Sequence, residues 1–136
     1  MKKTTAVASL ALAAMVLNGC AAVALTAVGV GMATGVSHHL NGMVYKTFST
    51  SQVKVKRAAY GAMNRMQIKV TQSKREGSNE TILAKAGDRE IVIELEALTP
   101  ATTRMKVQAK QNGGILTDGA TATEVILQTE RLVGNT

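Results

Sequence analysis

The chain has 136 residues, a formal net charge of +7 at pH 7 and a single cysteine, and its only aromatic side chains are two tyrosines and one phenylalanine. This length suits one small domain, and one cysteine excludes a disulfide within the fold. The core must therefore be aliphatic. The chain also lacks the aromatic platforms on which many nucleic-acid binders stack bases, so we expect no nucleic-acid partner.

The first twenty residues have the layout of a bacterial lipoprotein signal peptide. Lys2 and Lys3 precede an uncharged apolar run over residues 6–17. That run makes about 18 Å of helix at about 1.5 Å per residue, which is too short for a bilayer core of about 30 Å. It therefore indicates an export signal and not a membrane span. The sequence Leu-Asn-Gly-Cys closes the signal at Cys20.

This signal predicts that residues 1–19 are removed and that the Cys20 thiol carries a diacylglycerol, with a third acyl chain on the new amino terminus. Each buried methylene adds about 0.8 kcal/mol, so two or three chains make a lasting anchor. Ala21 stands where an aspartate retains many lipoproteins in the inner membrane. We therefore expect a cell-envelope protein in the outer membrane, facing the periplasm. The alternatives are ordinary cleavage after an Ala-x-Ala site, or an unprocessed anchor with a buried cysteine.

The segment 20–41 is predicted to link the anchor to the folded domain. Residues 21–37 carry no charge and contain a Gly-x-x-x-Gly pair, which makes a smooth helix face. Three arrangements are open for this segment: a membrane-proximal helix, a helix packed against a second copy or a partner, or a loose tether. The tether is included because glycine and β-branched residues form helices poorly. His38 and His39 end it, and adjacent histidines diverge, so we expect a linker there and no metal site.

The folded domain starts with a strand at residues 43–48, which is apolar on both faces. A helix over residues 52–66 follows, and either Ser49 and Gln52 form a capping box or Ser51 is the cap. The buried stripe of this helix comprises Val55, Ala58, Ala59, Ala62, Met63 and Met66. Its opposite face is basic.

Strands with a period of two residues are predicted at 67–71, 81–86, 89–97 and 102–110, with a polar turn over 74–79. Such alternation is typical of an antiparallel sheet covered on one face. A slip of one residue would turn a whole apolar face to water, so the last two strands must pair residues of equal parity. This predicts a hairpin with Leu95 opposite Met105 and Ile93 opposite Val107, closed by a loop at residues 99–101.

The same register places opposite charges across from each other on the solvent face of the hairpin. Glu96 would face Arg104 and Glu94 would face Lys106, with each pair contributing about 0.2–1 kcal/mol. We therefore interpret these glutamates as structural ion pairs and not as the paired carboxylates of an acid–base or metal site.

A second helix ends near Val133, with Asp118 or Thr121 as its amino-terminal cap and Gly134 at its carboxyl end. Its buried stripe comprises Ala122, Val125, Ile126, Thr129, Leu132 and Val133. The element order over residues 42–134 is β-α-β-β-β-β-α. It predicts an α+β two-layer sandwich, a mainly antiparallel sheet of about five strands with two helices on one face.

Several features together carry a resemblance over about residues 20–134. They are the motif ending at Cys20, the Ser-Thr-Ser-Gln start of an alanine-rich helix, the alternating Met66, Ile68 and Val70, the Leu98-Thr99-Pro100 turn before a Thr-rich strand, and a glycine-flanked last helix. In these the chain resembles a family of small, functionally uncharacterised bacterial envelope lipoproteins, a domain of unknown function. The resemblance implies a location in the cell envelope and a fold, and it implies no catalytic residues.

The polar residues do not suit an enzyme. Both histidines lie in the linker, and lipidation of Cys20 would leave no free thiol. No serine has a plausible histidine base. The Gly113-Gly114 pair lacks the Lys-Ser/Thr continuation of a phosphate-binding loop. We therefore expect no catalysis, no cofactor and no metal.

Two non-enzymatic functions fit the sequence. The first is a structural or adaptor lipoprotein that docks an unidentified envelope protein through a free sheet face or edge strand. The second is a binding module for anionic phospholipid or another anionic envelope ligand, although solubility alone also explains the positive charge. The candidate anionic-ligand surface comprises Lys54, Arg57, Arg65, Lys69, Arg104 and Lys106.

Overall fold

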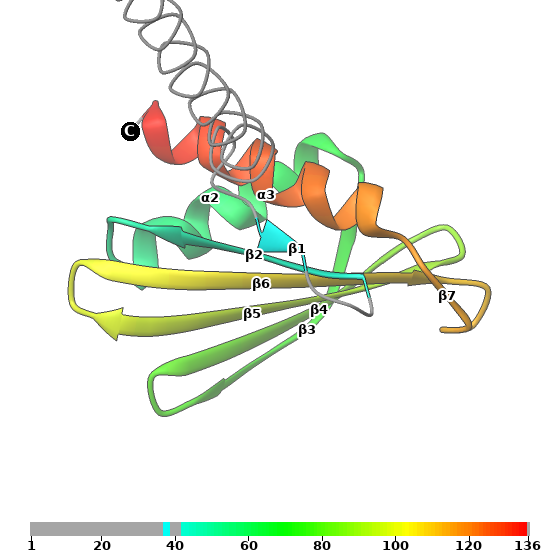
Figure 1. Cartoon of the computed structure of the whole chain (residues 1–136), viewed down its shortest axis with the longest axis horizontal. Coiled ribbons are helices and arrows are strands. Elements are labelled where there is room, and N and C mark those ends of the chain that lie inside the picture. Colours follow the sequence, from blue (N-terminus) through cyan, green and yellow to red (C-terminus); the bar gives the residue numbers. More distant parts are fainter. Residues whose placement is uncertain (1–36, 39–41, 136) are drawn as a thin grey trace, which may run out of the picture. The chain divides into compact units, whose positions relative to one another are not determined.

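The computed structural model describes residues 37–38 and 42–135. The signal peptide, Cys20 and nearly all of the segment 20–41 lie outside the described residues. The expectations of processing, lipidation and a tether therefore stay predictions. Figure 1 shows the chain, with the elements coloured by their place in the sequence.

Seven strands and two helices make up the described residues (Figure 1). In chain order they are β1 (Ser37–His38), β2 (Met43–Phe48), α2 (Gln52–Arg65), β3 (Lys69–Glu76), β4 (Asn79–Ala86), β5 (Arg89–Thr99), β6 (Thr102–Gln111), β7 (Leu116–Thr117) and α3 (Gly119–Gly134). The sheet order is β1-β2-β6-β5-β4-β3, with β7 beside β6, and every pair is antiparallel. The predicted α+β fold is confirmed. The strands β1 and β7 were not predicted from the sequence, because two residues are too few to show a period of alternation.

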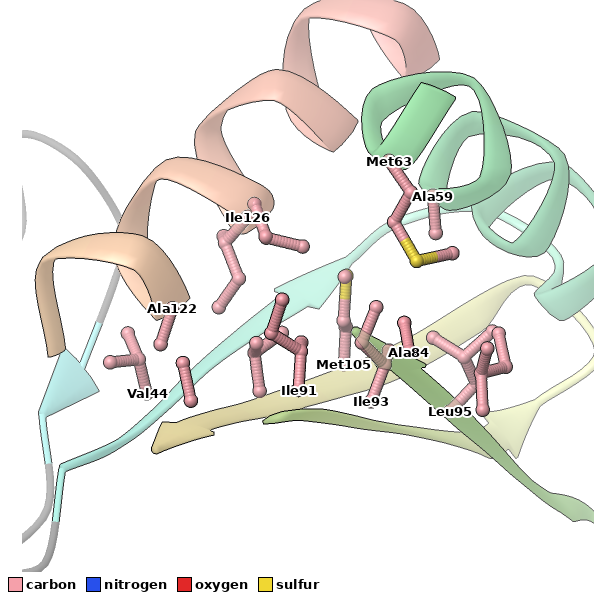
Figure 2. Close-up of a cluster of buried hydrophobic side chains, with 14 of the residues drawn as sticks. Val44, Ala59, Met63, Ala84, Ile91, Ile93, Leu95, Met105, Ala122 and Ile126 are labelled. Atoms are coloured by element: carbon pink, nitrogen blue, oxygen red, sulfur yellow. The ribbon is translucent and has the colours of Figure 1, made fainter. Parts of the chain in front are cut away.

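Both helices cover the same face of the sheet, and the core lies between the two layers (Figures 1 and 2). Every second residue of β5 and β6 points toward the helices, as the alternating burial of these strands shows. The fully buried apolar side chains include Val44, Val55, Met63, Ile82, Ile91, Ile93, Leu95, Met105, Val107, Val125 and Ile126. The core is thus aliphatic as predicted, with Phe48 as its one buried aromatic side chain in the described residues.

The central hairpin has the predicted register. Leu95 lies opposite Met105 and Ile93 lies opposite Val107. The turn takes only the two residues after Thr99, because a register shift near the end of β5 lets this strand continue further than expected. The alternation of core-facing residues along the two strands therefore determined their pairing, as expected from the cost of turning an apolar face to water.

The edge strand β3 departs from the expectation. The sequence predicts a strand over 67–71 and a polar turn over 74–79, but β3 continues to Glu76 and only Gly77 and Ser78 form the turn. The predicted turn is therefore in the right place but too long, and the predicted strand before it ends too early. Seven of the eight side chains of β3 are exposed, so this strand needs no alternation of apolar and polar residues, and its sequence shows none.

The structure decides between the alternative helix caps. Ser51 is the residue before α2, but its side chain makes no capping hydrogen bond. Gln52 is buried and bonds elsewhere in the fold, so it forms no capping box with Ser49. Asp118 caps α3, because its carboxylate accepts a hydrogen bond from the backbone N–H of Thr121 at 2.9 Å.

Two glycines allow close approach between elements. Gly42 has a φ of +67°, and a Cβ there would lie 2.6 Å from the Thr117 Cβ, so the start of β2 lies tight against β7. A Cβ on Gly61 of α2 would lie 3.0 Å from a Leu132 methyl carbon of α3. The small residue therefore lets the two helices approach where they contact.

Candidate functional site

The structure divides the six cations of the predicted anionic-ligand surface between different sides of the domain. Three of them, Lys54, Arg57 and Arg65, are exposed on α2. None of these three forms an ion pair in the described residues. Lys69 starts the edge strand β3. Arg104 and Lys106 alternate with buried residues of β6 and lie on the sheet face away from the helices. The six side chains do not form one continuous surface.

We call this helix-free side of the sheet the uncovered face. Its central charges are paired: Arg104 Nη1 lies 3.4 Å from Glu96 Oε2, and Lys106 Nζ lies 3.7 Å from Glu94 Oε2 and 3.9 Å from Glu96 Oε2. These are the cross-strand pairs that the sequence predicted. The two cations and two anions balance, so the centre of this face has little net charge.

Apolar side chains lie beside these ion pairs on the uncovered face. Leu83 of β4 and Val92 of β5 are direct cross-strand neighbours, and Leu83 is 36% exposed. A hollow of about 440 Å³ is lined by Met43, Tyr45, Arg104 and Lys106. The uncovered face therefore combines half-buried apolar groups with a fixed pattern of paired charges.

A second hollow, of about 450 Å³, lies between α2 and the β3–β4 hairpin. We call it the α2–β3 groove, and its lining comprises Gln52, Val53, Lys56, Arg57, Tyr60, Arg75 and Glu80. Arg75 and Glu80 are cross-strand neighbours, and Lys56 Nζ lies 5.8 Å from the centroid of the Tyr60 ring, within the range of a cation–π contact. The volume is that of a site for a small molecule or for a few side chains of a partner.

Glu80 is the buried charge of the α2–β3 groove, with a side chain only 3% exposed. Lys56 Nζ lies 2.5 Å from Glu80 Oε1, and Ser73 Oγ donates to the same oxygen at 2.8 Å. Burial raises the pKa of Glu80, but the hydrogen bonds from Lys56 and Ser73 and the charges of Lys56 and Arg75 outweigh it, so the pKa lies below its ordinary value. Glu80 is therefore ionised at neutral pH and ties β4 to α2.

Gln52 fixes the floor of the same groove. Its side-chain Nε2 donates to the carbonyl oxygen of Ser78 at 2.8 Å and to that of Leu95 at 2.9 Å. Its Oε1 accepts a longer bond from Arg75 Nη2 at 3.4 Å. Since both ends of this amide are engaged by the protein, the α2–β3 groove has an ordered floor of its own.

Of the residues that line the groove, only Arg57 was assigned to a candidate site from the sequence. A signal was available in the spacing of Gln52, Lys56 and Tyr60, which stand one helical turn apart between the apolar stripe and the basic face of α2. Glu80 gave no signal, because the predicted polar turn left it without a strand partner. The groove was therefore missed.

Asp118 is a second acid with strong partners. It accepts hydrogen bonds from the Thr121 backbone N–H at 2.9 Å, from Thr121 Oγ1 at 2.7 Å and from Arg89 Nε at 2.6 Å. The backbone and hydroxyl bonds from Thr121, followed by the bond from Arg89, lower the pKa of Asp118 to about 2. These contacts give it the role of a helix cap and of a link to β5.

Two other kinds of site were sought in the described residues. No group of three His, Cys, Asp or Glu side chains there lies close enough together to hold a metal ion. No helix among them is both long enough and apolar enough to cross a membrane.

Comparison with protein families identifies the relatives of this chain. The profile of a family described as protein of unknown function, DUF3568, matches residues 3–123. The match includes the whole sheet, α2 and the start of α3, and with them both hollows. A comparison with curated proteins finds no match. The predicted resemblance to an uncharacterised family is thus confirmed, and the chain belongs to the DUF3568 family of proteins of unknown function.

Proposed function

We propose that this protein is a lipoprotein of the bacterial cell envelope, acylated at Cys20 and held in the outer membrane facing the periplasm. The Leu-Asn-Gly-Cys motif behind a short apolar segment supports this anchor. Intact-mass measurement of protein extracted from membranes tests it, since the chain should begin at an acylated Cys20 and the Cys20→Ser variant should accumulate as precursor. A mature chain that begins elsewhere would contradict the proposal.

The folded domain then acts as a structural or adaptor protein that docks another envelope protein. The observation that supports this role is the uncovered face, which the helices leave open on the other side of the sheet (Figure 1). Its charges are paired with each other, so it offers little attraction to an anionic bilayer. Interfaces between proteins combine apolar contacts with a polar rim, and a fixed pattern of charges selects a partner with the complementary pattern.

A non-enzymatic role fits the way in which acidic side chains are used in the described residues. Glu80, Glu94 and Glu96 form ion pairs with lysine or arginine, and Asp118 caps α3. Glu94 and Glu96 lie on the open side of a sheet. Each of these carboxylates thus has a structural partner that accounts for its position.

Site-specific photo-crosslinking in intact cells tests the adaptor role. A photo-reactive side chain in place of Leu83, on the uncovered face, should give one discrete protein adduct. The same group in place of Arg131, exposed on α3, should give none. Combining Glu94→Lys with Lys106→Glu keeps the net charge but reverses the pattern that the partner meets, so the Leu83 adduct should fall several-fold. Equal adducts from both positions would contradict docking at this face.

The exposed cations of α2 favour a second candidate, binding to anionic phospholipid. Lys54, Arg57 and Arg65 are without ion-pair partners in the described part of the chain. A chain lacking residues 1–40 should then sediment with anionic vesicles and be released by salt, since the Debye length is about 10 Å at 0.1 M. Reversal of all three charges should abolish this binding. Salt-insensitive capture of one protein, without vesicle binding, would favour the adaptor.

A further inference from the structure

The α2–β3 groove opens onto the free edge of the sheet. β3 pairs with β4 on one side, and no described strand pairs with it on the other. β3 is eight residues long and almost wholly exposed. An edge of this length presents a row of unpaired backbone donors and acceptors, to which another extended chain can add.

The hairpin turn determines which backbone groups face outward. Gly77 and Ser78 form a two-residue turn, and Glu76 lies opposite Asn79. The residues that flank such a turn bond to each other, and the alternation of an antiparallel ladder then directs the N–H and C=O of Ser73 and Arg75 to the free edge. The side chains of these two residues face the groove, because Arg75 lines it and Ser73 bonds to buried Glu80. A strand added here would therefore place every second side chain in the groove.

The charges at this edge select the added strand. β3 carries Lys69, Lys74 and Arg75 against Glu76 alone, so its pairing with β3 of a second copy would bring like charges together. In the groove, Lys56 already neutralises Glu80. Arg57 and Arg75 supply the remaining positive charge: no ion pair engages Arg57 in the described residues, and Arg75 makes only long hydrogen bonds, at 3.4 Å.

Lysines on an edge strand often serve only to prevent aggregation. The groove beside β3 has features that protection against aggregation does not require. Its floor is built from two buried polar residues, Gln52 and Glu80, which are 7% and 3% exposed and held by hydrogen bonds. Val53, which is 61% exposed, and Tyr60 add an apolar wall. A floor that is ordered before binding lowers the entropy cost of taking up a partner.

We infer that the β3 edge and the α2–β3 groove bind an extended acidic segment of a partner protein by strand addition. The segment pairs with the backbone of Ser73 and Arg75, and its acidic side chains meet the guanidinium groups of Arg57 and Arg75. Its apolar side chains contact Val53 and Tyr60. This inference deepens the adaptor function, on which it rests, by naming the chemistry of the segment that the adaptor holds.

Binding of a defined peptide to the full chain in non-ionic detergent tests the inference. The probe is a fluorescein-labelled peptide of alternating glutamate and valine with the length of β3, eight residues, and a lysine–valine peptide is its control. Fluorescence anisotropy should show binding of the acidic peptide only. Arg57→Glu should weaken it by about five- to tenfold, since the contact of this residue with the acidic peptide changes from attraction to repulsion.

The matched control is Arg131→Glu, which makes the same change in net charge at an exposed position of α3. It should leave the peptide affinity within about twofold, because Arg131 is not among the residues that line the groove and is not expected to contact a peptide bound there. Equal weakening by Arg57→Glu and Arg131→Glu would overturn the inference, since binding would then depend on total charge. Binding of anionic vesicles with no binding of the peptide would also overturn it and assign the groove to a membrane.

Hydrogen exchange resolved at single amides gives the readout specific to strand addition. On binding, the amides of Ser73 and Arg75 should gain protection, whereas the Lys74 amide, which the ladder directs to β4, should change little. Binding without this alternation would overturn the inference. If the peptide fails to bind while Leu83 still gives its protein adduct, the inference falls and the adaptor function stands. If the peptide binds but Leu83 gives no adduct, docking at the uncovered face falls instead.

Discussion

Single charged residues hold the elements of this domain together. Glu80 joins β4 to α2 through Lys56, and Asp118 joins the start of α3 to β5 through Arg89. Both carboxyls have a pKa below the ordinary value, which burial alone would have raised. A lowered pKa means that the folded state favours the ionised form, so both groups stabilise the fold above their unfolded pKa and lose this contribution as the pH falls.

For Asp118, the shift from 3.8 to about 2 sets the pH window. The contribution of Asp118 to the free energy of unfolding should be constant above about pH 5 and should fall by about 2 kcal/mol toward pH 2, at about 1.4 kcal/mol per unit of pKa. Urea unfolding at a series of pH values measures this. Asp118→Asn keeps a capping group but removes the titration, so its stability should depend less steeply on pH over this window.

The control for this titration is Asp88→Asn, which removes a carboxyl at the exposed turn before β5. It leaves every partner of Asp118 in place, so the loss of stability that Asp118 causes at low pH should persist. Asp118→Ala removes the cap as well and should lower the free energy of unfolding by about 1–2 kcal/mol at neutral pH. Identical pH curves for the parent chain and Asp118→Asn would show that other groups cause the loss at low pH.

The ion pair of Lys56 and Glu80 should couple energetically. Lys56→Met leaves the buried carboxylate of Glu80 without its partner, at a cost of about 1–3 kcal/mol. Glu80→Gln should cost less, because the Lys56 side chain that it leaves unpaired is 40% exposed. The double variant should cost less than the sum of the two, by about 1 kcal/mol. A double-mutant cycle from urea unfolding measures this difference, and strictly additive effects would mean that the short distance has no energetic consequence.

Among the secondary-structure elements, contact with the core decided what the sequence could predict. β5 and β6 have one face on the core, so apolar parity determines their register, and the charges of Glu94 and Glu96 agree with it. The edge strand β3 has almost no core face, so its pattern does not show where it ends. The α2–β3 groove stands partly on this strand, so periodicity could indicate only the side of the groove that α2 provides. The strands β1 and β7 have two residues each, fewer than any alternation needs.

In the described part of the chain, every fully buried apolar side chain comes from β2 through α3, so we expect these elements to enclose the core by themselves. Of the described elements, a chain that starts at Gly42 loses only β1, which pairs with the edge of β2. We expect this chain to remain soluble and to unfold in one cooperative step in urea, followed by circular dichroism. Aggregation, or a broad transition without a folded baseline, would show that earlier residues complete the core.

The sheet order has a consequence for the rate of folding. β3, β4 and β5 each pair with the next strand in the chain, across turns of two residues. β2 pairs with β6 instead, and this pairing closes a loop that contains α2 and three strands. Local hairpins close at a smaller entropy cost than such a loop, so we expect the four-stranded part to form first.

Stopped-flow kinetics should show this order. Ile93→Val in β5 should slow folding, whereas Val44→Ala in β2 should mainly speed unfolding. If Val44→Ala slowed folding as much as Ile93→Val does, β2 would already be in place at the barrier. With the expected order, β2 lacks its strand partner during synthesis until β6 has been made, and its apolar side is covered only when α3 follows, so most of the chain must exist before the domain can close.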